Sequence, residues 1–133
     1  MSKRRPKRRS RERYGGQRLH EGEKRLIYEL DLHGLTWQEA QWALHKAPKD
    51  AVRHKARILK IIHGWGRSTG SSVLQENVRS WLARNPFRFR AAIPGERYHQ
   101  SDETTMQMRG EIGDFPDADF NRANRGITVV WLR

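Results

Sequence analysis

Cysteine is absent from all 133 residues of the chain. This absence excludes structural disulfides, thiolate nucleophiles and cysteine-based zinc sites in one step. The chain also lacks an apolar run long enough for a signal peptide or a membrane span, so we expect a cytoplasmic protein that contacts no membrane, with a nucleus or an organelle matrix as the alternatives. The length fits one domain, which can bury a modest core without a metal or a disulfide.

Positive charge is abundant and is concentrated at the beginning of the sequence. The chain carries 27 Lys and Arg against 15 Asp and Glu, which gives a net charge of +12. Residues 1–18 alone have a net charge of +8, which leaves +4 for the other 115 residues. Like charges repel, and this segment has almost nothing apolar to bury. We therefore expect residues 1–24 to be a disordered basic tail and linker, followed by a single domain over residues 25–133.

A tail of this composition binds polyanions. Each Lys or Arg that neutralises a phosphate releases a counterion, and this gives an affinity that does not depend on base sequence. Nucleic acid is the expected partner, because the rest of the chain is basic as well. A solubility tail and a localisation signal are the alternatives.

Four segments of the chain have the composition of β-strands. They are apolar and rich in β-branched or aromatic residues, which favour extended structure. The four segments are residues 25–32, 56–62, 87–93 and 126–133.

Two helices are expected between the first three strands. Thr36 and Glu39 have the spacing of a capping box, as do Ser72 and Gln75, and apolar residues recur at helical spacing behind each pair. Pro48 is expected to kink the first helix or to split it. The order β-α-β-α-β-β predicts an α/β fold, a two-layer sandwich of two main helices on a mixed four-stranded sheet whose first strands are parallel.

Histidine and glycine follow the first two strands in the same arrangement. "LDLHG" at residues 30–34 and "IIHGWGRSTGSS" at residues 61–72 each end a strand with His-Gly. The carboxyl ends of neighbouring parallel strands meet at one edge of a sheet, where ligands gather. We therefore expect Asp31, His33 and His63 to form one catalytic site, the alternative being that each histidine is a structural residue.

The loop after the second strand is suited to an anion. Its glycines allow close backbone approach, and its amides and the start of the next helix offer donors and a positive dipole. A phosphodiester is the expected ligand. The expected substrate-binding residues are Gly34, Gly64, Trp65, Gly66, Arg67, Ser68 and Gly70.

Three segments of the chain resemble the Smr domain, the small MutS-related module: "LDLHGLTWQEA", "ILKIIHGWGRSTGSSVLQENVRSWL" and "GITVVWL". The marks of this family are a Leu-Asp-x-His-Gly strand end and a His-Gly-x-Gly loop, and both occur here in order. The resemblance covers residues 26–93 and 125–133. It implies a sandwich like the C-terminal domain of a bacterial translation initiation factor, and nuclease activity on DNA or RNA. It places Asp31, His33 and His63 at catalytic positions and Gly64 and Gly66 in the substrate loop.

Two features depart from the family pattern. The loop after His63 is longer than the common form and has Trp65 where a basic residue is frequent. We interpret Trp65 as a platform on which a base stacks, with a hydrophobic lid as the alternative. Residues 94–125 connect the last two strands at unusual length and carry seven acids against four bases. This long loop or insertion either binds a partner or partly covers the site.

Two imidazoles and one carboxylate suit the cleavage of RNA without a metal. One imidazole takes a proton from the attacking oxygen, the other donates one to the leaving oxygen, and Asp31 fixes the tautomer of its histidine partner. In RNA the adjacent 2′-hydroxyl can be the nucleophile, and one clear carboxylate is a poor basis for a two-metal site.

We therefore expect a monomeric endonuclease without metal or cofactor that favours RNA over DNA, with the ribosome as a candidate partner. The alternatives are a non-catalytic RNA- or ribosome-binding module and a DNA-nicking repair or recombination factor.

Overall fold

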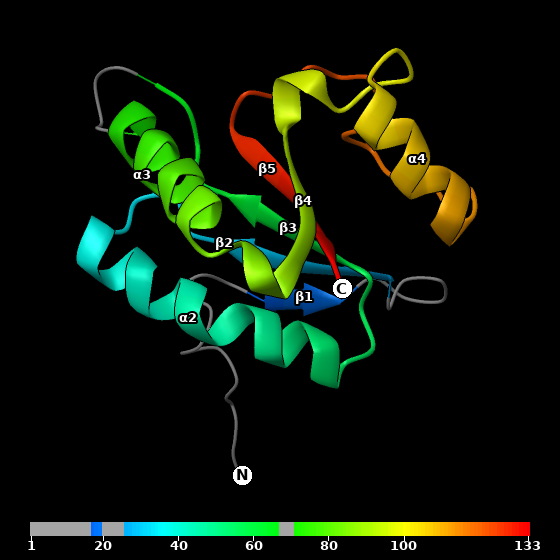
Figure 1. Ribbon diagram of the computed structural model, residues 1–133. Helices are drawn as coiled ribbons and strands as arrows, with labels where there is room; N and C mark the ends of the chain where they lie inside the picture. Colours follow the sequence, from blue (N-terminus) through cyan, green and yellow to red (C-terminus); the bar gives the residue numbers. More distant parts are fainter. Residues whose placement is uncertain (1–16, 20–25, 67–70) are drawn as a thin grey trace, which may run out of the picture.

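Five strands form one mixed sheet in the computed structural model, which describes residues 17–19, 26–66 and 71–133, with the side chains of residues 17–19, 71, 72 and 87 excepted. The strand order is β1-β2-β3-β5-β4 (Figure 1). β2 and β3 are parallel, and the other neighbouring pairs are antiparallel. The strands are β1 Gln17–Leu19, β2 Ile27–Asp31, β3 Ile58–Ile62, β4 Phe89–Pro94 and β5 Ile127–Leu132. The predicted α/β class and mixed sheet of four strands are confirmed, and β1 adds a short strand at one edge.

β1 lies within residues 1–24, where a disordered tail is predicted. Its three residues, "QRL", pair with β2 and have no strand pattern of their own. Residues 1–16 and 20–25 lie outside the described part of the chain, so the disorder of the tail stays a prediction.

Two helices cover one face of the sheet. α2 spans Trp37–Arg53 and α3 spans Ser71–Arg84, and both pack with β2, β3 and β5 around one hydrophobic core. The capping box of Thr36 and Glu39 is formed as predicted, because each side chain accepts a hydrogen bond from the backbone of the other residue. α2 runs as one helix through the buried Pro48, so the expected split does not occur.

The segment between β4 and β5 covers the opposite face. A 3-10 turn, η3 (Gly95–Arg97), leads to helix α4 (Glu103–Ile112), and the two lie on the far side of the sheet from α2 and α3 (Figure 1). Tyr98, Met108 and Phe115 from this segment are buried in a second core with residues of β3 and β5. Residues 94–125 therefore form a cover for the second sheet face.

A buried ion pair fixes this cover to the central strand. Lys60 of β3 is 3% exposed and is bonded to Asp117, and its Nζ donates to Asp119 Oδ2 at 2.9 Å. Tyr98 donates its hydroxyl hydrogen to Asp117 at 2.7 Å, and Arg109 Nη1 donates to the Tyr98 hydroxyl at 3.1 Å. Two of the seven acids of residues 94–125 thus neutralise a buried lysine.

Strand β4 begins later than its sequence pattern predicts. Residues Pro86–Arg88 form a 3-10 turn, η2, before β4 starts at Phe89. Proline fixes its own φ and has no N–H to donate, which suits a turn ahead of the strand. In the part of the chain that is described, no helix has the length and apolar character needed to cross a membrane.

Candidate active site at the ends of two parallel strands

The carboxyl ends of β2 and β3 lie side by side, as the sequence predicts. Asp31 is paired with Ile62 in the register of the two strands, and the Leu32 N–H donates to the Ile62 carbonyl at 2.6 Å. His33 and His63 therefore leave the sheet at one edge. We call this edge, with its two loops, the rim.

Glycines turn the chain at both strand ends. Gly34 has φ +84° and Gly64 has φ +79°, in the left-handed region that favours glycine. The carbonyl of Gly126, just before β5, accepts from the His63 N–H at 3.0 Å and from the Gly64 N–H at 2.9 Å. A Cβ on Gly126 would lie 3.4 Å from the Gly64 Cα, so the two backbones approach closely. The rim is thus held together by β5 as well as by β2 and β3.

Asp31 and His33 form an exposed hydrogen-bonded pair. Asp31 Oδ1 lies 2.6 Å from His33 Nδ1, and it also accepts from the His33 backbone N–H at 3.1 Å. The side chain of His33 is 67% exposed and that of Asp31 is 36% exposed. When the carboxylate accepts a hydrogen bond from Nδ1–H, the other ring nitrogen, Nε2, is the one that can take up a proton. This is the arrangement of a general base with a carboxylate that orients it.

His63 is in a different environment, because its side chain is fully buried. Its Nδ1 lies 2.9 Å from the Gly64 carbonyl oxygen, which accepts, and its Nε2 lies 2.9 Å from the Thr128 hydroxyl oxygen. Burial lowers the pKa of His63 below its usual value, and the nearby Arg79 guanidinium lowers it further, although the bond to Gly64 opposes the shift. The ring is therefore neutral at pH 7, with a proton on Nδ1 and with Nε2 accepting from Thr128.

Strand register explains why the two histidines do not point to the same place. Because Asp31 is level with Ile62, His63 is level with Leu32, and neighbouring residues along a strand point to opposite faces. Leu32 belongs to the core under the two helices, and His63 follows Leu59 and Ile61 onto that same face. The structure brings the two backbones together at the rim and sends the His63 imidazole into the protein.

Arg79 of α3 connects His63 to the rest of the molecule. Its Nε donates to the Thr128 hydroxyl at 2.9 Å, and its two terminal nitrogens donate to the Glu96 carboxylate at 2.9 and 3.0 Å. Burial alone raises the pKa of Glu96, but the hydrogen bond from Arg79 outweighs this and holds the pKa below its usual value. Arg79, Glu96 and Thr128 were not predicted from the sequence, since they come from three elements far apart in the chain.

Trp65 and Arg125 form an exposed surface beside the rim. The indole of Trp65 is 53% exposed, and the Arg125 guanidinium carbon lies 5.5 Å from its ring centroid. Gln75 Nε2 donates to the Arg125 carbonyl at 2.7 Å, which ties this loop to α3. Arg125 was not predicted, because it lies sixty positions from Trp65 in the chain, and a lone arginine in a polar loop gives no periodic signal.

The remaining predicted residues divide into two groups. Gly34 is exposed and Gly64 and Gly66 are half-buried, so all three lie at or near the surface of the rim. Arg67, Ser68 and Gly70 lie outside the described residues, as does the side chain of Ser72, whose capping box stays a prediction.

Comparison with known proteins gives a family match over most of the chain. The family model of the Smr domain matches residues 30–133. An uncharacterized protein of Treponema pallidum (strain Nichols) is 31% identical over 84 residues, which are 62% of this chain and 42% of that protein. The chain therefore spans less than half the length of this curated relative. The crystal structure of the Smr domain of Thermus thermophilus MutS2 matches with 27% identity and a TM-score of 0.49, over 79% of this chain and 96% of that one.

Proposed function

The chain belongs to the Smr domain family, and from this premise we propose that it is an RNA endonuclease in which Asp31 and His33 carry the proton transfer. The family is known for nucleic-acid binding and nuclease activity. The observation that carries the proposal is the Asp31–His33 pair, which is exposed at the same rim as Trp65 and Arg125. A base on the indole and a phosphate near the guanidinium would place a phosphodiester at the rim that carries His33.

The proposed reaction is the transesterification of RNA. His33 Nε2 accepts the proton of a 2′-hydroxyl, and the 2′-oxygen forms a bond to the adjacent phosphorus. The bond between phosphorus and the 5′-oxygen breaks, and the leaving oxygen takes a proton from solvent. The products are a 2′,3′-cyclic phosphate and a 5′-hydroxyl. Asp31 holds the imidazole in the required tautomer and stabilises its protonated form.

We propose a positioning role for His63. In the sequence-based hypothesis this residue is one of the two imidazoles that transfer protons, and that remains a prediction. Its burial and its two hydrogen bonds support a positioning role, in which the imidazole links the Gly64 turn to Thr128 and so holds the rim in place. Ribosome association, a monomeric state and a cytoplasmic location are further parts of the proposal and do not rest on the geometry of the site.

The burial of His63 also favours a second candidate function, a nucleic-acid-binding module that does not cleave. Only one of the two rim imidazoles is exposed, and the surface of Trp65 and Arg125 serves binding as well as cleavage. The product ends distinguish the two candidates.

Product analysis is the experiment that tests the proposed function. The purified protein is incubated with a single-stranded RNA and with a DNA of the same sequence, each with and without a chelator. We expect RNA fragments with cyclic phosphate and 5′-hydroxyl ends, equally abundant in both conditions, and intact DNA. Fragments with 5′-phosphate ends that disappear with the chelator would indicate water activated by a metal, and intact RNA that stays bound would indicate the binding module.

Trp65 should contribute to RNA affinity through its ring. We expect Trp65→Ala to weaken single-strand binding by about 1–3 kcal/mol, the usual contribution of a stacked base, and Trp65→Phe to recover much of the loss. Fluorescence anisotropy with a labelled oligonucleotide measures both. Equal weakening by Ala and Phe would exclude stacking and assign Trp65 a structural role.

A further inference from the structure

The outer face of α2 carries one indole and three cations in a narrow stripe. Trp42, Lys46, Lys49 and Arg53 follow one another at intervals of four, three and four residues, and all four are exposed. At 3.6 residues per turn they lie within about 60° of the helix circumference. We call these four residues the α2 stripe. The opposite side of the helix is buried through Ala40, Leu44, Ala47, Pro48 and Ala51.

The indole of the α2 stripe is more exposed than any other large hydrophobic side chain in the described part of the chain. Trp42 is 67% exposed, and the Lys46 ammonium lies 5.3 Å from its ring centroid. Tryptophan is highly buried on average, and it is enriched in interfaces. The Trp42–Lys46 pair repeats the arrangement of Trp65 and Arg125, since each has a cation over an open indole.

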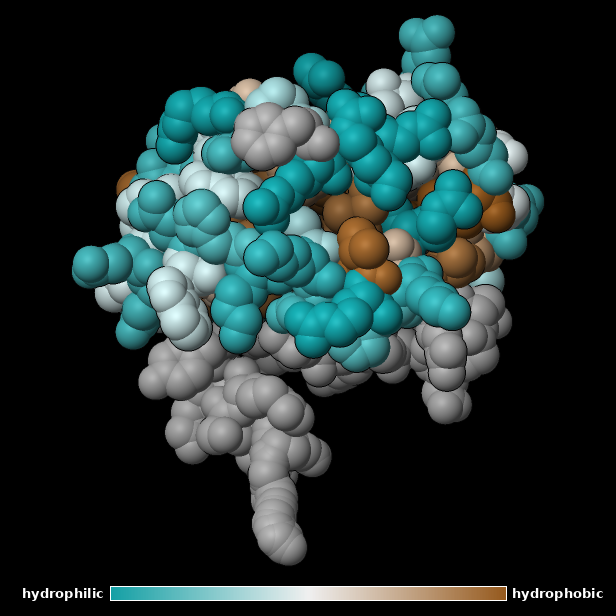
Figure 2. Space-filling view, turned by 60° about the horizontal axis from the view of Figure 1, so that its bottom comes forward, coloured by the Kyte–Doolittle hydropathy of each residue, from teal (hydrophilic) through white to brown (hydrophobic). Residues whose placement is uncertain are grey.

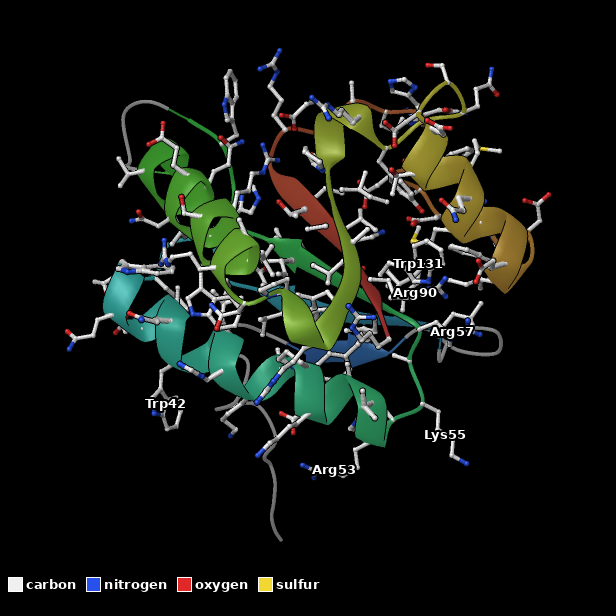
Figure 3. The ribbon with its side chains drawn as sticks, viewed as in Figure 1. Trp42, Arg53, Lys55, Arg57, Arg90 and Trp131 are labelled. Atoms are coloured by element: carbon white, nitrogen blue, oxygen red, sulfur yellow. The ribbon has the colours of Figure 1, made fainter. Side chains whose placement is uncertain are left out.

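The charge of this region determines the chemistry of its partner. The segment from Trp37 to Arg57 has five Lys and Arg against two acids. Of the acids, Glu39 caps the helix and Asp50 is bonded to Arg53 at 2.9 Å, while the Arg53 side chain stays 73% exposed. Trp42 and Arg53 both project from α2 away from the sheet, and Lys55 lies just beyond the end of the helix (Figure 3). An aromatic ring followed by a row of cations fits a nucleic acid.

The α2 stripe runs away from the rim. α2 begins four residues after His33, and the stripe begins five residues further along, at Trp42, and extends for about 16 Å at 1.5 Å per residue. With the bottom of the molecule turned forward, the surface seen is mostly hydrophilic (Figure 2). An RNA strand leaving the rim in this direction meets cations for its phosphates and a ring for one unstacked base.

We infer that the α2 stripe binds the single-stranded segment of RNA that extends from the cleavage site. The inference rests on the proposed function and adds a second binding surface to it. A duplex is a poorer fit, because its bases are stacked on each other and offer no face to Trp42.

The test compares two triple variants that lose the same charge. The first is Lys46→Gln, Lys49→Gln, Arg53→Gln in the α2 stripe. The control is Arg84→Gln, Arg88→Gln, Arg97→Gln, which removes three exposed arginines from α3, η2 and η3. Affinity for labelled oligouridylates of increasing length is measured at several salt concentrations, and melting curves check that both variants are folded.

We expect the α2 stripe variant to lower the salt dependence of binding to long oligouridylates by about 2 in the slope of log K against log salt. The control variant should change that slope by much less. Trp42→Ala should weaken binding to long oligouridylates about tenfold, with recovery in Trp42→Phe. Oligouridylates too short to extend beyond the rim should bind the parent and the α2 stripe variant equally.

Three results would overturn the inference. If the parent binds RNA and the two triple variants behave alike, the inference fails and the proposed function stands. If the α2 stripe variant keeps RNA affinity and loses binding to an acidic peptide, the surface binds protein instead. If the parent binds no oligouridylate at all, the proposed function fails together with the inference.

Discussion

Replacing His33 with alanine is expected to slow RNA cleavage by about 10²–10⁴-fold, the usual contribution of a positioned acid–base group. RNA affinity should change little, because Trp65, Arg125 and the basic tail remain. Thermal stability should also be close to that of the parent, since the His33 side chain is exposed. Single-turnover rates, anisotropy and melting curves on the same preparation measure the three quantities.

The matched comparison is His63→Ala, for which we expect a different pattern. Loss of the imidazole leaves the Thr128 hydroxyl and the Gly64 carbonyl without their buried partner, which costs about 1–3 kcal/mol of stability. Cleavage and binding should then fall together. Thr128→Val, which removes one partner and keeps the imidazole, should reproduce part of this loss.

A proton-donating His63 would behave otherwise. Residues that act as one catalytic unit lose activity non-additively, so His33→Ala, His63→Ala and the double variant would be similarly inactive, folded and able to bind. That result would restore the two-imidazole mechanism and contradict the positioning role. Three folded variants that cleave at the parent rate would end the catalytic proposal for both residues.

The pH dependence of stability provides a separate measure of His63. Burial lowers its pKa in the folded protein, so as pH falls the unfolded chain takes up the proton first. The contribution of His63 to the free energy of unfolding is therefore fully present above about pH 6.5. It is lost as the pH falls below this value. His63→Ala should lack this component, and His33→Ala should retain it.

Replacing Lys60 with methionine is expected to destabilise the fold by about 3–5 kcal/mol, as when one member of a buried ion pair is removed. Lys60 and Asp117 are 3% and 1% exposed, so the variant leaves a buried carboxylate without its cation. Such a loss is a large part of the total stability of an ordinary domain, about 5–15 kcal/mol. Urea unfolding at neutral pH measures the change.

The double variant Lys60→Met, Asp117→Asn is the control for charge. It removes the unpaired carboxylate, so we expect it to recover part of the loss.

Burial lowers the pKa of Lys60, but the Asp117 carboxylate outweighs burial, and the pKa stands above its usual value. The stability from this pair should therefore persist to about pH 10 and disappear above it. A cost below about 1 kcal/mol for Lys60→Met would show that the pair is replaceable.

Much of the fold could be predicted from local patterns in the sequence. The "LDLHG" and "IIHGWG" strand ends, each followed by a helix, were enough to predict parallel neighbours whose ends meet. The capping box at Thr36 was predicted for the same reason, because its two residues are three positions apart in the chain. Both features depend on short-range spacing, and such spacing is visible in a single chain.

The orientation of His63 was missed although a signal for it exists. Leu59 and Ile61 alternate along β3, and His63, just beyond its end, keeps the same spacing, so it is expected to point into the core. The prediction of two catalytic imidazoles rested on the repeated His-Gly step and did not use this alternation. The partners of His63 could not be inferred, because Thr128 and Arg79 reach it only through the fold.

Lys60 shows the limit of strand patterns. It lies inside the apolar run "ILKII", and the residues that neutralise it come 57 and 59 positions later. The acids of residues 94–125 were noted in the sequence, but their number does not say which cation they meet. Only the packing of the cover on the sheet decides this.

An RNA with a single 2′-deoxynucleotide tests the proposed cleavage most directly. The substrate is a single strand of otherwise uniform ribonucleotides, and the products are mapped position by position with the parent protein in the presence of a chelator. If a 2′-hydroxyl activated by His33 is the nucleophile, cleavage should continue at the ribonucleotides and stop only at the bond that follows the deoxynucleotide. Cleavage at that bond with unchanged efficiency would contradict the proposed chemistry.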